Sequence, residues 1–492
     1  MIPTDQKFHP VYGITAMCFG ILLGAIFARF WLSGWLVNYF WFFIYIFIAF
    51  VLLRIGRFWC VVAMLIIGIL MGYTRGSSEM LANLPITKFY NQNVKISGVI
   101  TEDISKTKSG DGAMKLSIKT VADQIASGNL WVVVRAADAV NLRRSDDIVL
   151  EGKLKEGFGS FSGSMYRAKV IEVKRETAKD PFVDIRDWLS GGIYKHLPEK
   201  EAALGAGYIL GQKQALPVDF DEALRIVGLT HVVVASGYNL TILVRLARRL
   251  FMRVSRYTAA ISGVAMTLTF IGITGISPSM MRAGLVSLLS LIAWYYGRKL
   301  NPIVLLFFTA AISIMVQPAY IWGDVGWILS FASFAGVMLF APVLQAYFYG
   351  EKPPGTVRQI LGETFSAQLF TLPIILMMFG TLSNVSLIVN LLVLPFIPLA
   401  MFMVFVTAIT SLWLPVISPL FATPTLWLLQ YMTGIVDIFS ELSWASVEVE
   451  FSLPMVIVSY LLIGILTTWL YRRSRISYNN VNIIVVNVKK II

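Results

Sequence analysis

Residues 228–249, GLTHVVVASGYNLTILVRLARR, place His231, Ser236, Gly237 and Asn239 in an otherwise apolar run. An imidazole, a hydroxyl and an amide in such a run can bind a polar ligand or line a wet cavity, and a serine beside a histidine base can act as a nucleophile. Polar groups cost free energy in lipid unless they face a protein interior or water. These side chains are therefore expected to face away from lipid.

Polar residues also interrupt two later apolar runs. GISPSMMRAG contains Ser279 and Arg282, and GDVGWILSF contains Asp324 and Ser330. An arginine at the centre of a span costs about 2.5 to 3.5 kcal/mol on insertion scales. Glycine, proline and serine let a helix break, and broken helices at membrane depth usually line a cavity. We expect a pore or channel motif made of His231, Ser236, Gly237, Asn239, Ser279, Arg282, Asp324 and Ser330.

Each of these residues also has a structural interpretation. The small and polar residues at 236–239 could serve helix packing, and Arg282 could extend to the membrane surface. Asp324 could cap the helix that follows it, and His231 could form an interfacial hydrogen bond. The sequence leaves both interpretations open.

The composition places these runs in a membrane protein. Of 492 residues, 57% are hydrophobic and 14% are charged, against roughly 25% charged residues in soluble domains. We expect a polytopic α-helical membrane protein with about twelve transmembrane helices and an extracytoplasmic OB-like β-barrel insert. The expected spans are 11–29, 32–53, 58–73, 231–247, 257–275, 280–296, 302–318, 323–342, 363–380, 385–410, 420–440 and 453–471.

Residues 90–176 differ from the rest because their apolar residues alternate with polar ones. Five short runs show this pattern, namely VKISGVI, MKLSIK, LWVVVRA, DIVLEGKL and YRAKVIEV. Five short strands separated by turn residues are typical of a small closed barrel of the OB kind, with a β-sandwich insert as the alternative.

The domain organisation follows from these patterns. DIRDWLSGGIYKHL and PVDFDEALRIVGL are expected to be amphipathic helices, and EAALGAGYILG is too short to cross, so it is either buried or re-entrant. The expected parts are N-terminal transmembrane helices at 1–77, the extracytoplasmic OB-like domain at 88–177, a channel domain at 183–452, and a last span with a basic cytoplasmic tail at 453–492.

The basic loops set the expected orientation. With twelve spans, the short loops rich in Lys and Arg fall on one side, which should be the cytoplasm. The β domain then faces outward. The basic cytoplasmic loop after the span at 231–247 comprises Arg245, Arg248, Arg249, Arg253 and Arg256, which are by default topology determinants.

Metal and nucleotide chemistry are not expected. Cys18 and Cys60 lie inside spans, and His9, His196 and His231 have no clustered Asp or Glu, so there is no disulfide framework and no metal-ligand set. The sequence has no P-loop. We therefore expect a protein that is not an enzyme and holds no cofactor.

The sequence resembles the competence domain of the ComEC family of DNA-uptake channel proteins. The resemblance lies in the three apolar runs that polar residues interrupt and in AQLFTLPIILMMFGTLSNVSLIVNLLVLPFIPLAM. The late pattern comprises Phe379, Gly380, Asn390, Leu391, Leu392 and Pro395. The family commonly continues S-G-L-H, whereas Tyr238 and Asn239 follow Ser236 and Gly237 here. The metallo-β-lactamase-like domain of many members is not in this sequence, so strand degradation is assigned to another protein.

The resemblance implies an inner-membrane channel that passes single-stranded DNA into the cytoplasm during natural transformation. A net charge of +13 and a pI near 9.6 are compatible with a polyanionic partner. Residues 90–175 carry 14 Lys and Arg against 10 Asp and Glu, a net charge of +4. OB barrels hold single strands with basic grooves and stacked aromatics, although aromatics are sparse here. Candidate DNA contacts are Lys115, Lys119, Arg143, Arg144, Arg167 and Lys169.

The resemblance and the energetics also imply partners. Moving DNA toward a negative cytoplasm costs about 2.3 kcal/mol per charge at 100 mV, so a separate ATPase or helicase-like motor must pull the strand. A separate DNA receptor, a nuclease and membrane lipid complete the expected partners, and an oligomer stays open. The alternatives are a small-molecule or ion transporter, an intramembrane serine protease using Ser236, and a family member that no longer transports.

Overall fold

The computed structural model describes residues 9–31, 40–55, 57–107, 109–175, 180–212, 216–233, 236–298, 300–350 and 355–474. The chain divides into two compact units, of which unit 1 comprises 1–178 and 303–328, and unit 2 comprises 179–302 and 329–492. The tail expected after the last span begins at residue 475, outside the described residues.

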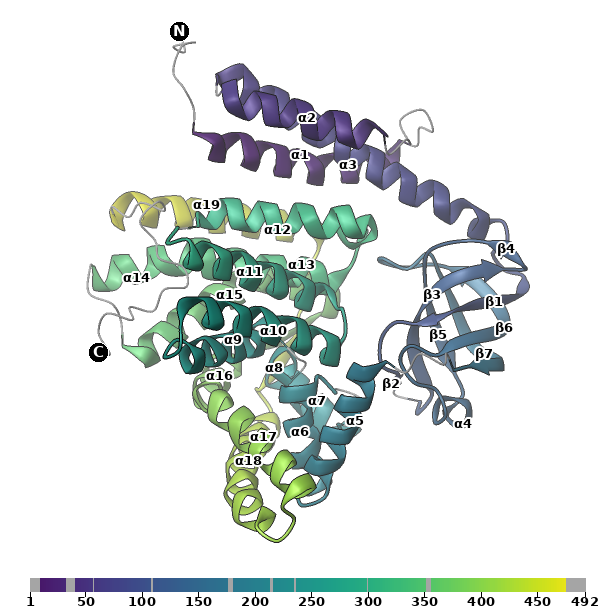
Figure 1. The fold of residues 1–492 in the computed structure, drawn as a ribbon, viewed down its shortest axis with the longest axis vertical. Helices are drawn as coiled ribbons and strands as arrows, with labels where there is room; N and C mark the ends of the chain where they lie inside the picture. The colour runs from purple at the N-terminus through teal and green to yellow at the C-terminus, as the bar shows by residue number, and fades with distance from the viewer. Residues whose placement is uncertain are drawn as a thin grey trace. The chain divides into compact units, whose positions relative to one another are not determined.

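Unit 1 begins with three helices, α1 (Pro10–Phe30), α2 (Phe40–Ile55) and α3 (Phe58–Thr87), seen in Figure 1. Glycines let the backbones of α1 and α3 touch: a β-carbon on Gly24 would lie 2.0 Å from the carbonyl oxygen of Ile69, and one on Gly72 would lie 2.0 Å from that of Ile21. The glycine one turn earlier on each helix has the same role, which is the small-residue packing of membrane helices. The third helix extends to Thr87, beyond the expected boundary at 77.

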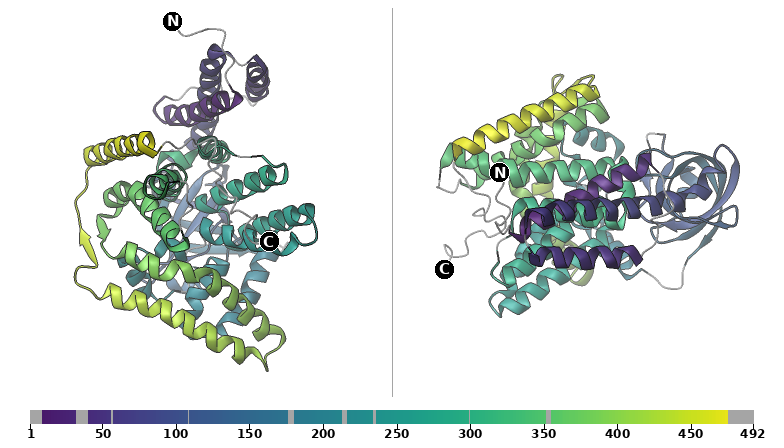
Figure 2. Two further views of the ribbon diagram at one scale, coloured as in Figure 1. Left: turned by 90° about the vertical axis from the view of Figure 1, so that its left-hand side faces the viewer. Right: turned by 90° about the horizontal axis from the view of Figure 1, so that it is seen from above.

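The β domain is a closed barrel of five strands. These are β1 (Asn93–Ile100), β3 (Gly112–Val121), β5 (Asn129–Val134), β6 (Asp147–Glu156) and β7 (Gly163–Lys174), with the shorter β2 (Ser105–Lys106), β4 (Gln124–Ile125) and α4 (Ala136–Ala139). The strands close in the order β1-β3-β5-β7-β6-β1, and only the β5–β7 pair is parallel. The right-hand view of Figure 2 shows the closed ring. The prediction of five strands in a small barrel is confirmed.

The barrel forms because alternate residues of each strand face one apolar interior. Ile96 pairs with Leu150, and Leu116 pairs with Leu130, and all four side chains are completely buried. Lys95, next to Ile96, is exposed. Burial of apolar surface contributes roughly 25 cal/mol per Å², so this alternation fixes the register of the strands.

Unit 1 also contains a later part of the chain, namely most of α12 (Pro302–Val316), the 3-10 helix η2 (Pro318–Trp322) and the start of α13 (Val325–Ala335). Arg75 of α3 donates to the carbonyl oxygens of Met315 and Val316, each at 2.9 Å, at the C-terminal end of α12. The indole nitrogen of Trp322 donates to the carbonyl oxygen of Ala25 at 2.8 Å. A cation at the C-terminal end of a helix is stabilising, so Arg75 ties α12 to α3.

Unit 2 is helical apart from one short strand pair. Its elements are α5 (Pro181–Tyr194), α6 (Glu199–Leu210), α7 (Val218–Ile226), α8 (Thr230–Val233), α9 (Gly237–Phe251), α10 (Arg256–Thr274), α11 (Pro278–Tyr295), the rest of α13, the π-helical turn η3 (Gly336–Phe340), α14 (Ala341–Tyr349), α15 (Thr356–Phe379), β8 (Thr381–Ser383), α16 (Ser386–Val393), η4 (Leu394–Phe396), α17 (Ile397–Trp413), α18 (Ser418–Ser440), β9 (Ser446–Glu448) and α19 (Leu453–Ser474).

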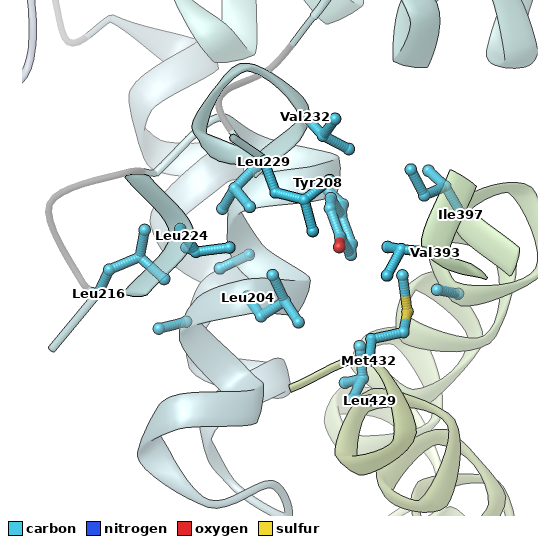
Figure 3. Packing of buried hydrophobic residues seen from close by; sticks show 14 of the residues in the cluster. Leu204, Tyr208, Leu216, Leu224, Leu229, Val232, Val393, Ile397, Leu429 and Met432 are labelled. Carbon is cyan, nitrogen blue, oxygen red and sulfur yellow. The ribbon is translucent and has the colours of Figure 1, made fainter. Parts of the chain in front are cut away.

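The largest apolar core of unit 2 surrounds α6. Leu204 and Tyr208 of α6 are buried together with Val232 of α8, Val393 of α16 and Met432 of α18, as Figure 3 shows. The short apolar piece that was expected to be either buried or re-entrant is therefore a helix buried among other helices. It is small-residue-rich, and this lets its neighbours approach closely.

Seven described helices are long and apolar enough to cross a membrane: 10–30, 58–87, 256–274, 325–349, 357–379, 386–413 and 453–474. Two shorter apolar helices occupy 41–55 and 302–316. The expected number of twelve spans is not confirmed. The expected span at 231–247 is interrupted, while α11 and α18 contain polar residues that reduce their hydropathy.

A broken helix with a buried arginine

The run at residues 228–249 forms two helices with a break between them. The first, α8, ends at Val233, and α9 begins at Gly237 after an extended residue, Ser236, at φ −107° and ψ 162°. Residues 234 and 235 lie outside the described residues. A 15-residue helix is about 22 Å long, which is too short to cross the roughly 30 Å hydrocarbon layer, so α9 alone does not form the expected span at 231–247.

Both sides of the break pack against α6. A β-carbon on Gly207 would lie 2.7 Å from the carbonyl oxygen of Val233, so only glycine allows α8 to end there. On the other side, the amide nitrogen of Asn239 donates to the carbonyl oxygen of Tyr208 at 3.1 Å. The last four carbonyls of a helix have no partner within the helix, and Asn239 satisfies one of them. The break is thus fixed to the C-terminal turn of α6.

Asn239 is completely buried and acts as a structural clamp. Besides the bond to Tyr208, its side-chain oxygen accepts a hydrogen bond from the hydroxyl of Ser236 at 3.4 Å. An amide donates and accepts on one short side chain, which suits a site between two helix ends. These contacts favour the packing interpretation for Asn239, and a pore role for it stays a prediction.

Arg282 lies in the second turn of α11 and reaches both the break and α13. Its Nη1 donates to the carbonyl oxygen of Ser330 at 3.0 Å, and its guanidinium lies 5.3 Å from the ring centre of Phe334. Its Nη2 lies 2.9 Å from the position of a β-carbon on Gly237. The structure therefore brings together Gly237, Arg282 and Ser330, with Ser236 and Asn239 in the adjoining turn of α9.

Two polar atoms at this place lack a partner among the residues that the structure describes. The Nε of Arg282 and the hydroxyl of Ser330 are buried without a hydrogen bond, and Ser330 as a whole is only 8% exposed. Within the same described ranges, Arg282 forms no ion pair. A buried charge without a counter-ion is costly unless a ligand or water compensates for it.

The other two expected motif residues of unit 2 lie outside this cluster. His231 is exposed on α8. Ser279 is half-buried in the first turn of α11, where Ser277 caps the helix by accepting a hydrogen bond from the amide of Met280 at 3.3 Å. No hydrogen bond joins either residue to Arg282 in the described part of the chain, and a shared role for all eight residues stays a prediction.

Asp324 has a structural role in unit 1. One of its carboxylate oxygens accepts a hydrogen bond from the amide of Trp327 at 2.8 Å, and the other accepts one from the hydroxyl of Ser160 at 3.0 Å. The first contact caps α13, as the structural interpretation anticipated. The second contact holds the β6–β7 loop, where Gly159 and Gly323 approach so closely that a β-carbon on Gly159 would lie 2.9 Å from the Gly323 carbonyl oxygen.

Lys115, one of the residues expected to contact DNA, packs against the same loop. The Nζ of Lys115 lies 5.9 Å from the ring centres of both Phe161 and Tyr320, and forms an ion pair with Glu102 at 3.3 Å. Burial, followed by Asp324 and Glu102, raises the pKa of Tyr320 to about 12, so its phenol stays neutral beside the cation. Lys115 is only 8% exposed and is engaged in these contacts, and a DNA contact by Lys115 stays a prediction.

The remaining expected DNA contacts fall into two classes. Arg144 is 8% exposed, and Lys119 forms an ion pair with Asp147 at 2.8 Å. Arg167 and Lys169 of β7 are exposed. Arg143 is exposed as well, and its backbone amide donates to Asp146.

Aromatic residues of the barrel pack against one another. Trp131 packs edge-on against Phe158 and Phe161 at ring distances of 6.2 and 5.4 Å.

The arginines that follow the break lie on and after α9. Arg245, Arg249, Arg253 and Arg256 are exposed, while the guanidinium of Arg248 lies 5.0 Å from the Trp294 ring centre. The opposite face of α9 packs against α10 and α11 through a small apolar cluster. An amphipathic helix with an arginine-rich exposed face is therefore present at the expected basic loop.

Sequence reasoning missed a second buried polar group in unit 2. The side-chain amides of Gln368 and Asn390 both donate to the hydroxyl of Ser386, at 2.7 and 3.2 Å. A β-carbon on Gly228 would lie 2.5 Å from that hydroxyl, so α16 lies against the turn before α8. The late family pattern pointed to Asn390, but Gln368 and Ser386 carry no signal in the sequence alone.

Metal ligation was not expected, and the described residues contain no group of three or more His, Cys, Asp or Glu that could hold a metal ion.

Comparison with known proteins gives one match. The sequence model of a family described as Competence protein matches residues 208–473, which is more than half of the 492 residues. No curated protein and no solved structure matches the chain. The matched segment contains α9, α11 and α13, and hence the arginine cluster at the break. The chain therefore belongs to the Competence family, whose members are membrane proteins of DNA uptake.

Proposed function

We propose that this protein is an inner-membrane channel that passes single-stranded DNA into the cytoplasm during natural transformation. The carrying observation is Arg282, a half-buried arginine at a broken helix, whose Nε is buried without a hydrogen bond and which has no carboxylate partner among the described residues. A strand with one negative charge per nucleotide would supply the missing charge as it passes. Membership of a DNA-uptake family and a net charge of +13 support the proposal.

The channel needs partners because transport opposes the membrane potential. Each nucleotide costs about 2.3 kcal/mol at 100 mV, and the sequence has no P-loop. A separate ATPase or helicase-like motor would pull from the cytoplasm, where the exposed arginines at Arg245 to Arg256 would meet it or the emerging strand. A separate receptor and nuclease would deliver the strand. The chain itself would carry out no reaction and hold no cofactor.

The barrel would face outward and receive the strand. Its five-stranded order with one parallel pair supports an OB-like fold, a fold that often binds oligonucleotides. Arg167 and Lys169 are exposed on β7 and remain the best contacts among the residues that the sequence suggested. Lys115 would instead hold the barrel to η2.

The rival functions have less support. An intramembrane serine protease needs a base beside Ser236, but the described partner of the Ser236 hydroxyl is the side-chain oxygen of Asn239. A small-molecule or ion transporter would also use a broken helix. It would be favoured if a transported solute, and not DNA, depended on the protein.

The test is the uptake of labelled DNA into a nuclease-protected cytoplasmic pool. A deletion strain is complemented with the wild-type protein or with Arg282→Ala. Loss of internalisation on deletion, with surface binding of DNA retained, would support the channel. Internalisation that is unchanged by deletion would contradict it and would make solute transport the leading function.

A further inference from the structure

The start of α9 and the side chain of Arg282 place two positive ends together. The N-terminus of a helix carries roughly half a positive charge, and the guanidinium carries a full one. The Nη2 of Arg282 lies 2.9 Å from the position of a β-carbon on Gly237, the first residue of α9. Such a pair is unfavourable unless an anion lies between the two.

The first turn of α9 also has unused donors. Its N-cap residue, Ser236, makes no side-chain cap, and its hydroxyl donates to the side-chain oxygen of Asn239. The first backbone bond of the helix runs from the amide of Leu240 to the carbonyl of Ser236. The amides before Leu240 have no acceptor within the helix, which is the usual state of an anion-binding helix end.

The orientation of Arg282 leaves one edge of its guanidinium free. Nη1 is held by the carbonyl oxygen of Ser330, whereas Nε is buried without a partner in the described part of the chain and Nη2 lies beside Gly237. Nε and Nη2 form the side edge of the guanidinium, a fork that matches two oxygens of a phosphate group. Ser330, whose carbonyl oxygen holds Nη1, is 8% exposed, and its hydroxyl is buried without a hydrogen-bond partner among the described residues.

We propose that the side edge of Arg282 and the first-turn amides of α9 form a binding site for one phosphodiester group of the transported strand. The proposal rests on the DNA-channel function and adds a defined subsite to it. One phosphate would satisfy the Nε of Arg282, the helix N-terminus and the charge of the guanidinium together. Gly237 would be required because a larger residue there would push Nη2 away.

The experiment uses the full chain in lipid nanodiscs and a labelled oligothymidylate. Arg282→Gln should weaken binding by about tenfold, and should reduce the slope of log affinity against log salt by about 0.7, the value for one phosphate on a single strand. Arg282→Lys should restore the salt slope but not the full affinity, because an ammonium has no fork. The control Arg298→Gln removes an exposed arginine of the same unit and should change neither quantity.

A second variant separates a loss of DNA binding from a loss of folding. Gly237→Ala keeps the charge and meets only the mobile end of Arg282 and the β-carbon of Ala283, so the fold should persist while binding weakens by severalfold. A neutral methylphosphonate oligothymidylate should bind equally to all variants. Equal binding of the phosphodiester strand to wild type and Arg282→Gln would overturn the proposal.

Two outcomes separate this site from the proposed function. If cells with the wild-type protein internalise DNA but Arg282→Gln leaves binding unchanged, the subsite fails and the channel stands. If the protein does not support DNA uptake but inorganic phosphate protects the wild type against thermal unfolding and does not protect Arg282→Gln, the anion site stands and its ligand is not DNA.

Discussion

The β barrel and the helix break both contain basic side chains, but they differ in how those charges are compensated. In the barrel, Lys115 pairs with Glu102 and Lys119 pairs with Asp147. At the break, Arg282 has a main-chain carbonyl and an aromatic ring as its neighbours. The comparison teaches that the pairing of a cation, and not the net charge of its domain, indicates where an anionic strand could bind.

The largest effect should come from Arg282→Gln, which tests the cation at the helix break that has no ion-pair partner among the described residues. We expect DNA internalisation to fall by about a hundredfold if the guanidinium contributes about 2.8 kcal/mol to the passage of the strand. The melting temperature of the purified protein should stay the same or rise, because a buried charge without a counter-ion is removed. A large fall in melting temperature would show that Arg282 is structural and would remove the contrast.

The next effect should come from Asn239→Ala. It leaves the Tyr208 carbonyl and the Ser236 hydroxyl without their partner, so we expect a loss of about 1 to 3 kcal/mol in stability. The measurement is thermal unfolding in detergent, followed by the uptake assay. Asn239→His tests whether an imidazole can replace the amide, and full stability of Asn239→Ala would contradict the clamp.

A smaller effect is expected for Lys115→Gln, which tests a cation of the barrel that has an ion-pair partner. Loss of the ion pair and of the contacts with Phe161 and Tyr320 should lower the stability of unit 1 by about 1 kcal/mol. DNA binding by the nanodisc-embedded protein should not change, because the side chain is already engaged. A drop in affinity with a lower salt slope would instead make Lys115 a DNA contact.

The smallest effect should come from the double variant Arg167→Gln and Lys169→Gln. Both side chains are exposed, so stability should change by less than about 0.5 kcal/mol. If both contact phosphates, the salt slope of oligothymidylate binding should fall by about 1.4. An unchanged slope would rule out Arg167 and Lys169 as DNA contacts and would leave Arg143 as the exposed candidate among the residues that the sequence suggested.

Local patterns predicted the local structure well. The alternation in VKISGVI and MKLSIK predicted two of the barrel strands because a period of two places alternate side chains on one face. Glycine and serine near 236 pointed to a break, and Asp324 offered a cap for the helix that follows it. Each of these features depends on residues that are close together in the chain.

Long-range partners could not be predicted in the same way. Asn239 reaches Tyr208, and Arg282 reaches Ser330, only because the helices pack at a particular depth and angle. The pairing of Lys115 with Glu102 likewise depends on the barrel register. The number of spans stays a prediction, because apolar composition does not reveal where a helix is interrupted or buried within the protein.

The hydrogen bonds donated by Asn239 and Arg282 both end on main-chain oxygens, those of Tyr208 and Ser330. A main-chain acceptor survives any substitution of its own side chain. These contacts should therefore leave no covariation signal between positions 239 and 208, or between 282 and 330. A saturation screen should find that only the donor positions, 239 and 282, demand a particular chemical group, while position 330 accepts other small residues.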